Sequence, residues 1–283
     1  MLALGLSIIL GAAYSHVLRH AQGRQRQMAW TGAISYVLAT VAMAFLCQVF
    51  RPAPCGWREA GYGVVGGLAW VATYLFFNLG IRLAGVSITQ CVTWLAVTVP
   101  VVAGMAVWGE TPTSLQSAGL ALVLLALALL LAEQPRDNPT PSRWRVPVLA
   151  AAFLAEGANS LAMKAYTKSA PGVDDGGVLL WMFGAAAVGM VATAGLTEAR
   201  PSRGDLAHGT VLAAVITVAN LAFMTAMRQL PAPIMFPSFW AGSVVLTAVA
   251  AMWLWHERYR ARAWAGMGLA LLAMVLLHLR QVG

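Results

Sequence analysis

The chain has 283 residues, of which 60% are hydrophobic and only 10% are charged, and its mean hydropathy is +0.73. Because soluble domains carry about 25% charged residues, this composition excludes an ordinary soluble protein and predicts an integral membrane protein, which we place in the cell membrane. The net charge of +8 comes from basic residues in short connections, which orient helices and meet anionic lipid. We therefore expect no nucleic-acid partner.

Ten apolar segments of spanning or near-spanning length make up almost the whole chain. They are residues 1–18, 29–50, 60–81, 85–108, 113–132, 146–166, 177–197, 208–228, 232–255 and 262–280. In lipid only helices and closed barrels satisfy the backbone, and these segments are too long and too uniformly apolar for barrel strands. The sequence therefore predicts an all-α polytopic membrane protein with ten transmembrane helices, the first of which is a retained helix and not a signal peptide.

The two halves of the chain repeat. The most polar connection, residues 133–143, divides the segments five and five. A shift of 147 residues superimposes uncommon residue types in one register: Trp108 on Trp255, Glu110 on Glu257, Met105 on Met252 and Gly119 on Gly266. A repeat with an odd number of helices must insert upside down relative to its copy. This predicts two inverted five-helix repeats, residues 1–134 and 143–283, in one membrane domain with a central site.

Glu156 lies near the middle of the sixth segment. A carboxylate at bilayer depth costs roughly 2.5–3.5 kcal/mol on insertion scales, so it usually marks a site. Helical spacing places Asn159 and Ser160 on the same face, and we expect this face to look into the protein. One interpretation is a structural acid that holds helices together. The other is a carboxylate that binds a cation or exchanges a proton, since burial without a cationic partner raises the pKa of a carboxyl group toward neutrality.

Other side chains deep inside the segments are candidates for solute binding. Among the aromatic residues these are Trp70, Trp94 and Trp240, and among the polar ones Tyr74, Asn78, Gln90 and Asn220. A buried tryptophan can form a flat wall for an organic or cationic solute, or can simply pack in the core. Each polar side chain can contact a solute or hydrogen-bond a neighbouring helix. Both interpretations stay open for each residue.

Some further residues predict local features. Pro100 and Pro237 are expected to loosen the fourth and ninth segments, and Gly63 and Gly67 to permit close helix packing. His16 is expected at the membrane interface, because a basic residue follows three positions later. The sequence shows no metal-ligand cluster, no Ser–His pair and no phosphate loop, so we expect no metal, no cofactor and no enzymatic activity.

Two junctions carry a resemblance to a known family. Trp108-Gly109-Glu110-Thr111-Pro112 and Trp255-His256-Glu257-Arg258, each followed by a glycine-containing apolar helix, resemble the helix–Gly-Glu–helix junction of EamA-type transporters in the drug/metabolite transporter superfamily. Separately, Leu154-Ala155-Glu156 with Met163-Lys164 resembles the first helix of the small multidrug resistance proteins of the same superfamily. The resemblance to EamA-type transporters covers the whole chain, whereas the second one covers part of a single helix.

This resemblance implies a transporter in which the fourth and ninth helices, with Trp94 and Trp240, lie beside a central cavity. It further implies that Glu156 exchanges protons for cationic solutes, although the first repeat has no matching acid. We interpret Glu110 and Glu257 differently. At helix ends, a carboxylate can accept from the free N–H groups that start the next helix, so we expect both to be caps.

The expected function is therefore secondary transport, with export favoured, of a small organic metabolite or drug-like solute by alternating access. The alternative within transporters is a uniporter or exchanger of sugars, amino acids or nucleotide-linked solutes, with Glu156 structural. A polytopic lipid-modifying enzyme and a membrane scaffold are the other classes considered. The partners expected are the solute, H⁺ and lipid. A monomer is sufficient to build the cavity, and a dimer stays an alternative.

The basic residues give conflicting indications of orientation. The connections on the same side as the two termini hold 6 of the Arg and Lys residues, and the opposite set holds 12. The positive-inside rule therefore favours both termini outside, whereas the resemblance implies both inside.

Overall fold

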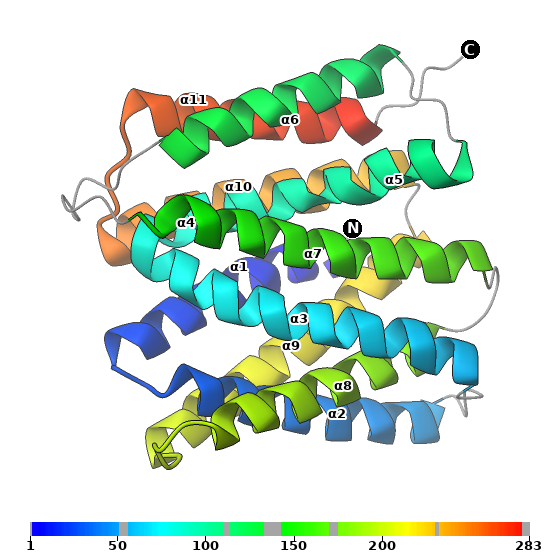
Figure 1. Cartoon of the computed structure of the whole chain (residues 1–283), viewed down its shortest axis with the longest axis vertical. Coiled ribbons are helices and arrows are strands. Elements are labelled where there is room, and N and C mark those ends of the chain that lie inside the picture. The colour runs from blue at the N-terminus through cyan, green and yellow to red at the C-terminus, as the bar shows by residue number, and fades with distance from the viewer. Residues whose placement is uncertain are drawn as a thin grey trace.

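The structure of the chain is a computed structural model that describes residues 2–50, 56–109, 114–132, 143–169, 175–229 and 232–278. These residues are mostly helical and include no strand, and turns such as residues 24–27, 196–202 and 256–260 join successive helices (Figure 1). In chain order the elements are α1 (Leu2–Gly23), α2 (Met28–Phe50), α3 (Trp57–Ala84), α4 (Val86–Trp94), the 3-10 helix η1 (Leu95–Val97), α5 (Thr98–Trp108), α6 (Ser114–Ala132), α7 (Arg145–Ser169), α8 (Asp175–Gly195), α9 (Arg203–Gln229), α10 (Ala232–Trp255) and α11 (Ala261–His278).

Seven stretches within the described residues are long and apolar enough to cross a membrane. They are Leu2–Gly23, Met28–Val49, Glu59–Ala84, Val86–Trp108, Arg145–Tyr166, Gly176–Gly195 and Arg203–Phe223. The described apolar parts of α6, α10 and α11 are shorter. The prediction of an all-helical chain is confirmed, and the length and composition of these helices are those of a multi-pass membrane protein.

The fourth predicted segment is not one continuous α-helix. It consists of α4 and α5, joined by the 3-10 turn η1 (Leu95–Val97). Pro100 accounts for the change, because proline has no N–H to donate and its ring crowds the carbonyl group four residues earlier, which belongs to Ala96. Pro237 was also expected to loosen its helix, but α10 runs without a break from Ala232 to Trp255.

Helices from the two halves of the chain pack against each other instead of forming two separate bundles. α3 packs against α7 and α8, α2 against α8 and α9, and α1 against α9 and α10. α4 lies between α3, α7 and α10. α6 and α11 form a pair that lies at one edge of the molecule (Figure 1).

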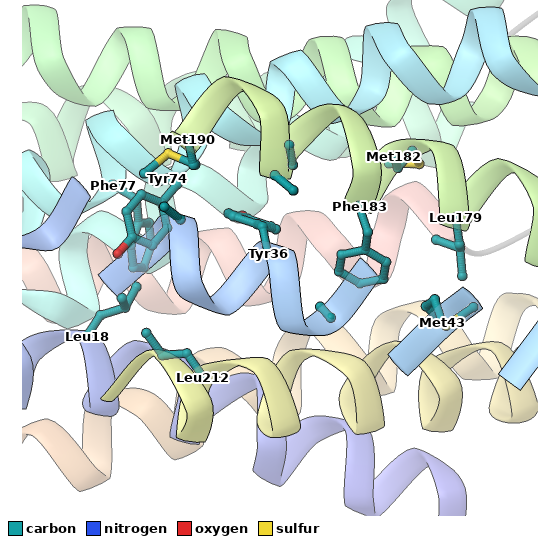
Figure 2. Packing of buried hydrophobic residues seen from close by; sticks show 14 of the residues in the cluster. Leu18, Tyr36, Met43, Tyr74, Phe77, Leu179, Met182, Phe183, Met190 and Leu212 are labelled. Atoms are coloured by element: carbon teal, nitrogen blue, oxygen red, sulfur yellow. The ribbon is translucent and has the colours of Figure 1, made fainter. Parts of the chain in front are cut away.

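The largest buried cluster joins α2, α3, α8 and α9. Figure 2 shows the ring of Tyr36 amid this cluster, together with Tyr74, Phe183 and Met190. Close approach of α3 and α8 requires glycine, because a Cβ at Gly67 would lie 2.4 Å from the carbonyl oxygen of Met182. The predicted packing role of Gly63 and Gly67 is thereby confirmed.

One end of the bundle is fastened by a capping box at the start of α9. The Asp205 carboxylate accepts from the Ser202 backbone N–H (2.8 Å) and hydroxyl (2.7 Å), and the Ser202 hydroxyl accepts from the Asp205 N–H (3.2 Å). The same carboxylate accepts from the Gln27 N–H (3.0 Å) at the start of α2. Reciprocal bonds of this kind satisfy the donors that a helix start leaves free, and here they also join two distant connections.

Glu257 caps a different helix from the one we expected. Its carboxylate accepts from the N–H of Val86, the first residue of α4, at 2.9 Å, whereas the sequence predicted a cap on the following helix, α11. Gly85 explains the choice, because its φ of +83° turns the chain directly from α3 into α4 and its missing Cβ leaves room for the carboxylate. Glu110 lies outside the described residues.

Tyr259 holds this cap in place. Its hydroxyl group lies 2.6 Å from the hydroxyl oxygen of Ser87 and hydrogen-bonds the Glu257 carboxylate. Burial and the neighbouring carboxylate raise the pKa of Tyr259 above its usual value, so the phenol keeps its proton. Since the carboxylate can only accept, the phenol donates to Glu257 and Ser87 donates to the phenol.

Candidate functional site

Glu156 lies at the middle of α7 with a partly buried side chain. Asn159, one turn further on, donates from Nδ2 to the carboxylate oxygen Oε1 at 3.3 Å. The hydroxyl group of Thr73 on α3 lies close to the same carboxylate but makes no hydrogen bond of ordinary geometry. The carboxylate is also near enough to the Tyr36 hydroxyl on α2 to act on it electrostatically. An acid of the second half therefore faces hydroxyl groups of the first half.

A group of aromatic rings packs around Tyr36. The Tyr36 ring centroid lies 6.3 Å from that of Trp70 and 6.0 Å from that of Tyr74, and the Trp70 centroid lies 5.0 Å from that of Phe183. The Tyr14 hydroxyl on α1 lies beside that of Tyr36. Tyr74 is thus part of the packed core around Tyr36 (Figure 2), and Trp70 is partly buried against it.

Tyr74 and Asn78 already have hydrogen-bond partners within the protein. The Tyr74 hydroxyl donates to the carbonyl oxygen of Met28 at 2.9 Å. Asn78 donates from Nδ2 to the Tyr74 carbonyl oxygen at 2.7 Å, and its Oδ1 accepts from Gln22 Nε2 at 2.9 Å. These bonds join α3 to α1 and α2, which is the interhelical role considered from the sequence.

Gln90 and Trp94 form a separate group on α4. The Gln90 side chain is 1% exposed, and neither of its polar atoms has a partner among the described residues. The Trp94 ring centroid lies 5.9 Å from that of Phe239 on α10. Phe239 is the neighbour of Trp240, whose own side chain lies outside the described set.

The remaining predicted residues lie on α7 and α9. Ser160 is partly buried next to Asn159, whose Oδ1 has no partner among the described residues. Asn220 donates from Nδ2 to the Ile216 carbonyl oxygen of its own helix at 2.8 Å. Lys164 donates from Nζ to the Pro100 carbonyl oxygen at 3.0 Å. Its amine is therefore bound by the first turn of α5, which follows the 3-10 turn η1.

The depth of His16 in the membrane stays a prediction, but the structure gives this residue contacts that the sequence did not indicate. Its side chain is buried, and its Nδ1 accepts from the indole N–H of Trp255 at 3.0 Å. The basic residues that follow it in the sequence belong to the next turns of α1, which reach the end of the bundle. Burial comes from the packing of α1 on α10, which the sequence alone does not show.

Sequence reasoning missed Thr73 on α3, which lies close to Glu156, and Tyr36 on α2, which the carboxylate affects electrostatically. A signal was present, because Tyr36 is a tyrosine well inside an apolar segment, where its hydroxyl group needs a partner. Nothing in the spacing of a single helix could have shown that this hydroxyl group lies beside that of Tyr14 on α1 and within electrostatic range of a carboxylate of α7.

The chain was compared with known proteins. No protein-family model matches it, and no curated protein does. A solved structure, described as a crystal structure of a protein, is similar with a TM-score of 0.63 and 15% sequence identity, over 97% of this chain and 94% of that one. At this identity the similarity shows a shared fold and nothing about activity.

Proposed function

We propose that this chain is a secondary active transporter that moves a small organic solute across the cell membrane, in the direction of export, by alternating access. The observation that carries the proposal is the position of Glu156. Its carboxylate lies midway along an apolar helix, close to the Thr73 hydroxyl group of α3 in the other half of the chain. An ionised carboxylate at such depth is costly unless a proton or a cationic group compensates it.

The helix packing supports the proposed plan of ten membrane-crossing helices in two inverted repeats. Exchanging the first five segments for the second five, in order, maps the most extensively packed helix pairs onto one another, whereas the weaker pairs α1–α3, α1–α4, α2–α3 and α4–α11 have no counterpart of similar extent among the described residues. The pair α3–α7 becomes α9–α1, α3–α8 becomes α9–α2, and α1–α10 becomes the pair of α7 with α4, η1 and α5. The pairs α2–α8, α6–α11 and α4–α10 are exchanged with themselves. A twofold axis relating two repeats has this consequence.

The doubled Trp-x-Glu junctions at Trp108 and Trp255 are the reason to propose the EamA-type branch of the drug/metabolite transporter superfamily. In such an arrangement Glu156 binds either a proton or the solute. Binding of one releases the other, and each occupied form biases the equilibrium between conformations open to the two sides. The partners of the protein are then a small-molecule solute, H⁺ and lipid.

Flux into proteoliposomes tests this function. Purified protein is reconstituted, and uptake of radiolabelled aromatic cations and of neutral aromatic amides is followed with and without an imposed pH gradient. We expect saturable, protein-dependent flux of at least one class, which the gradient accelerates. If every solute enters at the rate of protein-free vesicles, with correctly inserted and folded protein, the transporter proposal is wrong.

A further inference from the structure

α4 and α10 run antiparallel across the middle of the molecule, and two contacts fix their register. At one end the Val86 N–H binds Glu257 at 2.9 Å, and at the other the ring centroids of Trp94 and Phe239 lie 5.9 Å apart. Gln90 is halfway between the two contacts on α4. The corresponding level on α10 is that of Ser243, four residues from Phe239, and Thr247 lies one helical turn further along the same face.

The polar side chains at this level and one turn beyond it are buried and have no hydrogen-bond partner in the part of the chain that the structure describes. Gln90 is 1% exposed, and Ser243 and Thr247 on α10 are 0% exposed. The Gln90 amide nitrogen and oxygen and both hydroxyl oxygens have no hydrogen-bond partner among the described residues. Other hydroxyl groups in these helices behave differently, since Thr89 and Thr93 donate to the carbonyl groups four residues earlier, at 2.7 and 2.8 Å.

α1 closes the group from a third side. A Cβ at Gly11 would lie 3.9 Å from the Ser243 hydroxyl oxygen, so this serine faces α1. One turn and a little further on α1, His16 lies near the Thr247 backbone. The Trp255 indole N–H can only donate, so His16 Nδ1 accepts from it, and in the neutral ring the proton is on Nε2. That nitrogen lies close to the Thr247 backbone but makes no hydrogen bond of ordinary geometry with it or with another described residue.

We propose that His16, Gln90, Ser243 and Thr247 line a subsite for an uncharged hydrogen-bonding group of the solute, such as a primary amide or a hydroxyl. The inference rests on the proposed transport function and names the chemistry of what is carried. An amide and two hydroxyl groups both donate and accept, and an imidazole N–H donates, so together they complement a neutral group that does the same. The adjoining apolar part of the solute lies against Trp94 and Phe239, which form an aromatic wall one turn away.

The energetic cost of burying these unpaired polar groups is the reason to assign them to binding and not to packing. A buried polar atom without a partner destabilises the folded state. A site built to hydrogen-bond a solute also rejects analogues that lack the matching group, because its own polar atoms are then left unpaired. The unpaired polar atoms that destabilise the solute-free protein are therefore the same atoms that select a solute with the matching group.

Three probes that differ only in their head group test the subsite. They are 3-phenylpropanamide, 3-phenylpropanoate and 3-phenylpropylammonium, each radiolabelled and measured by equilibrium dialysis against the full chain in lipid nanodiscs. We expect saturable binding of the amide, which the carboxylate does not displace. Thr247→Val and Gln90→Met should weaken amide binding about tenfold or more, and Thr247→Ser should restore it. Thr210→Val is the matched control, because this exposed hydroxyl binds the Leu206 carbonyl of its own helix.

A second readout separates binding from a structural role. Thr247→Val and Gln90→Met remove unpaired buried polar atoms, so the melting temperature of the solute-free protein should stay the same or rise. Absence of saturable amide binding, or equal binding by wild type and both variants, would overturn the inference. A lowered melting temperature with unchanged amide binding would do the same.

The outcome is distinguishable from failure of the transport proposal. Amide binding that depends on Thr247 and Gln90, but without flux of any solute, keeps the subsite and removes the transport function. Flux of an aromatic solute that neither substitution changes, together with unchanged binding, keeps transport and removes the subsite.

Discussion

At the scale of single residues, the neighbourhood of Glu156 was partly readable from the sequence. Helical spacing placed Asn159 on its face, and the hydrogen bond between the two follows from that spacing. Spacing within one helix could not supply Tyr36 and Thr73, because these come from α2 and α3 through tertiary packing. For the same reason Tyr74 and Asn78 were left between two interpretations until their partners were known.

The hydrogen bond from Tyr74 to Met28 predicts that the Tyr74 hydroxyl group serves helix packing. Tyr74→Phe removes a buried donor and leaves the Met28 carbonyl oxygen without it, so we expect the free energy of unfolding to fall by about 1 kcal/mol. Solute flux should stay within about twofold of wild type if the hydroxyl serves packing alone. Thermal unfolding in detergent and proteoliposome flux check both statements.

Tyr62→Phe is the control for this experiment, because the Tyr62 hydroxyl meets only an exposed partner, Ser169. Loss of flux in Tyr74→Phe without loss of stability would contradict the packing role and return Tyr74 to the solute-contact residues.

At the scale of elements, the extents of the helices were close to the predicted segments, because apolar length and Gly, Pro and charged residues mark both ends. The irregular turn η1 followed from Pro100. The Ser202-x-x-Asp205 box was also a readable signal. The partner of Glu257 was not, since the sequence shows that a carboxylate follows α10 but not which helix start comes to meet it.

The cap on α4 allows a test that separates two effects of a Gly85 substitution on stability: displacement of the Glu257 carboxylate and backbone strain at positive φ. Gly85→Ala places a Cβ 2.9 Å from Glu257 Oε1 at a φ of +83°, so we expect a loss of about 1–3 kcal/mol in stability. Gly109→Ala has a similar φ of +63° with nothing within 4 Å, and it should cost less. Melting temperatures of the two variants give the comparison, and equal losses would show that displacement of the carboxylate contributes nothing.

At the scale of the whole molecule, the proposal of a repeat came from uncommon residues that recur in one register, whereas the packing of helices from the two halves against each other could not be predicted. Contacts between distant connections now show which of them share an end of the bundle. Gln27 binds Asp205, Val86 binds Glu257, and the His20 ring lies 6.4 Å from that of Trp255. These connections belong to the set that holds 12 of the Arg and Lys residues.

We therefore predict that this end faces the cytoplasm, as the positive-inside rule requires. In a chain whose cysteines are replaced, Ser202→Cys should react with a membrane-impermeant maleimide in inside-out vesicles and not in intact cells. Ser169→Cys, exposed at the end of α7, should show the opposite pattern. The reverse labelling of both positions would assign the termini to the cytoplasm.

The central claim is that Glu156 couples solute movement to protons, and one measurement tests it most directly. Proteoliposomes containing wild type, Glu156→Gln or Glu156→Asp are given an imposed pH gradient, and accumulation of a solute already shown to be carried is followed. We predict that wild type accumulates the solute and that Glu156→Asp retains part of this ability. Glu156→Gln should fold and insert but fail to accumulate solute, because its amide cannot exchange a proton. Gradient-driven accumulation by Glu156→Gln at the wild-type rate would contradict the account.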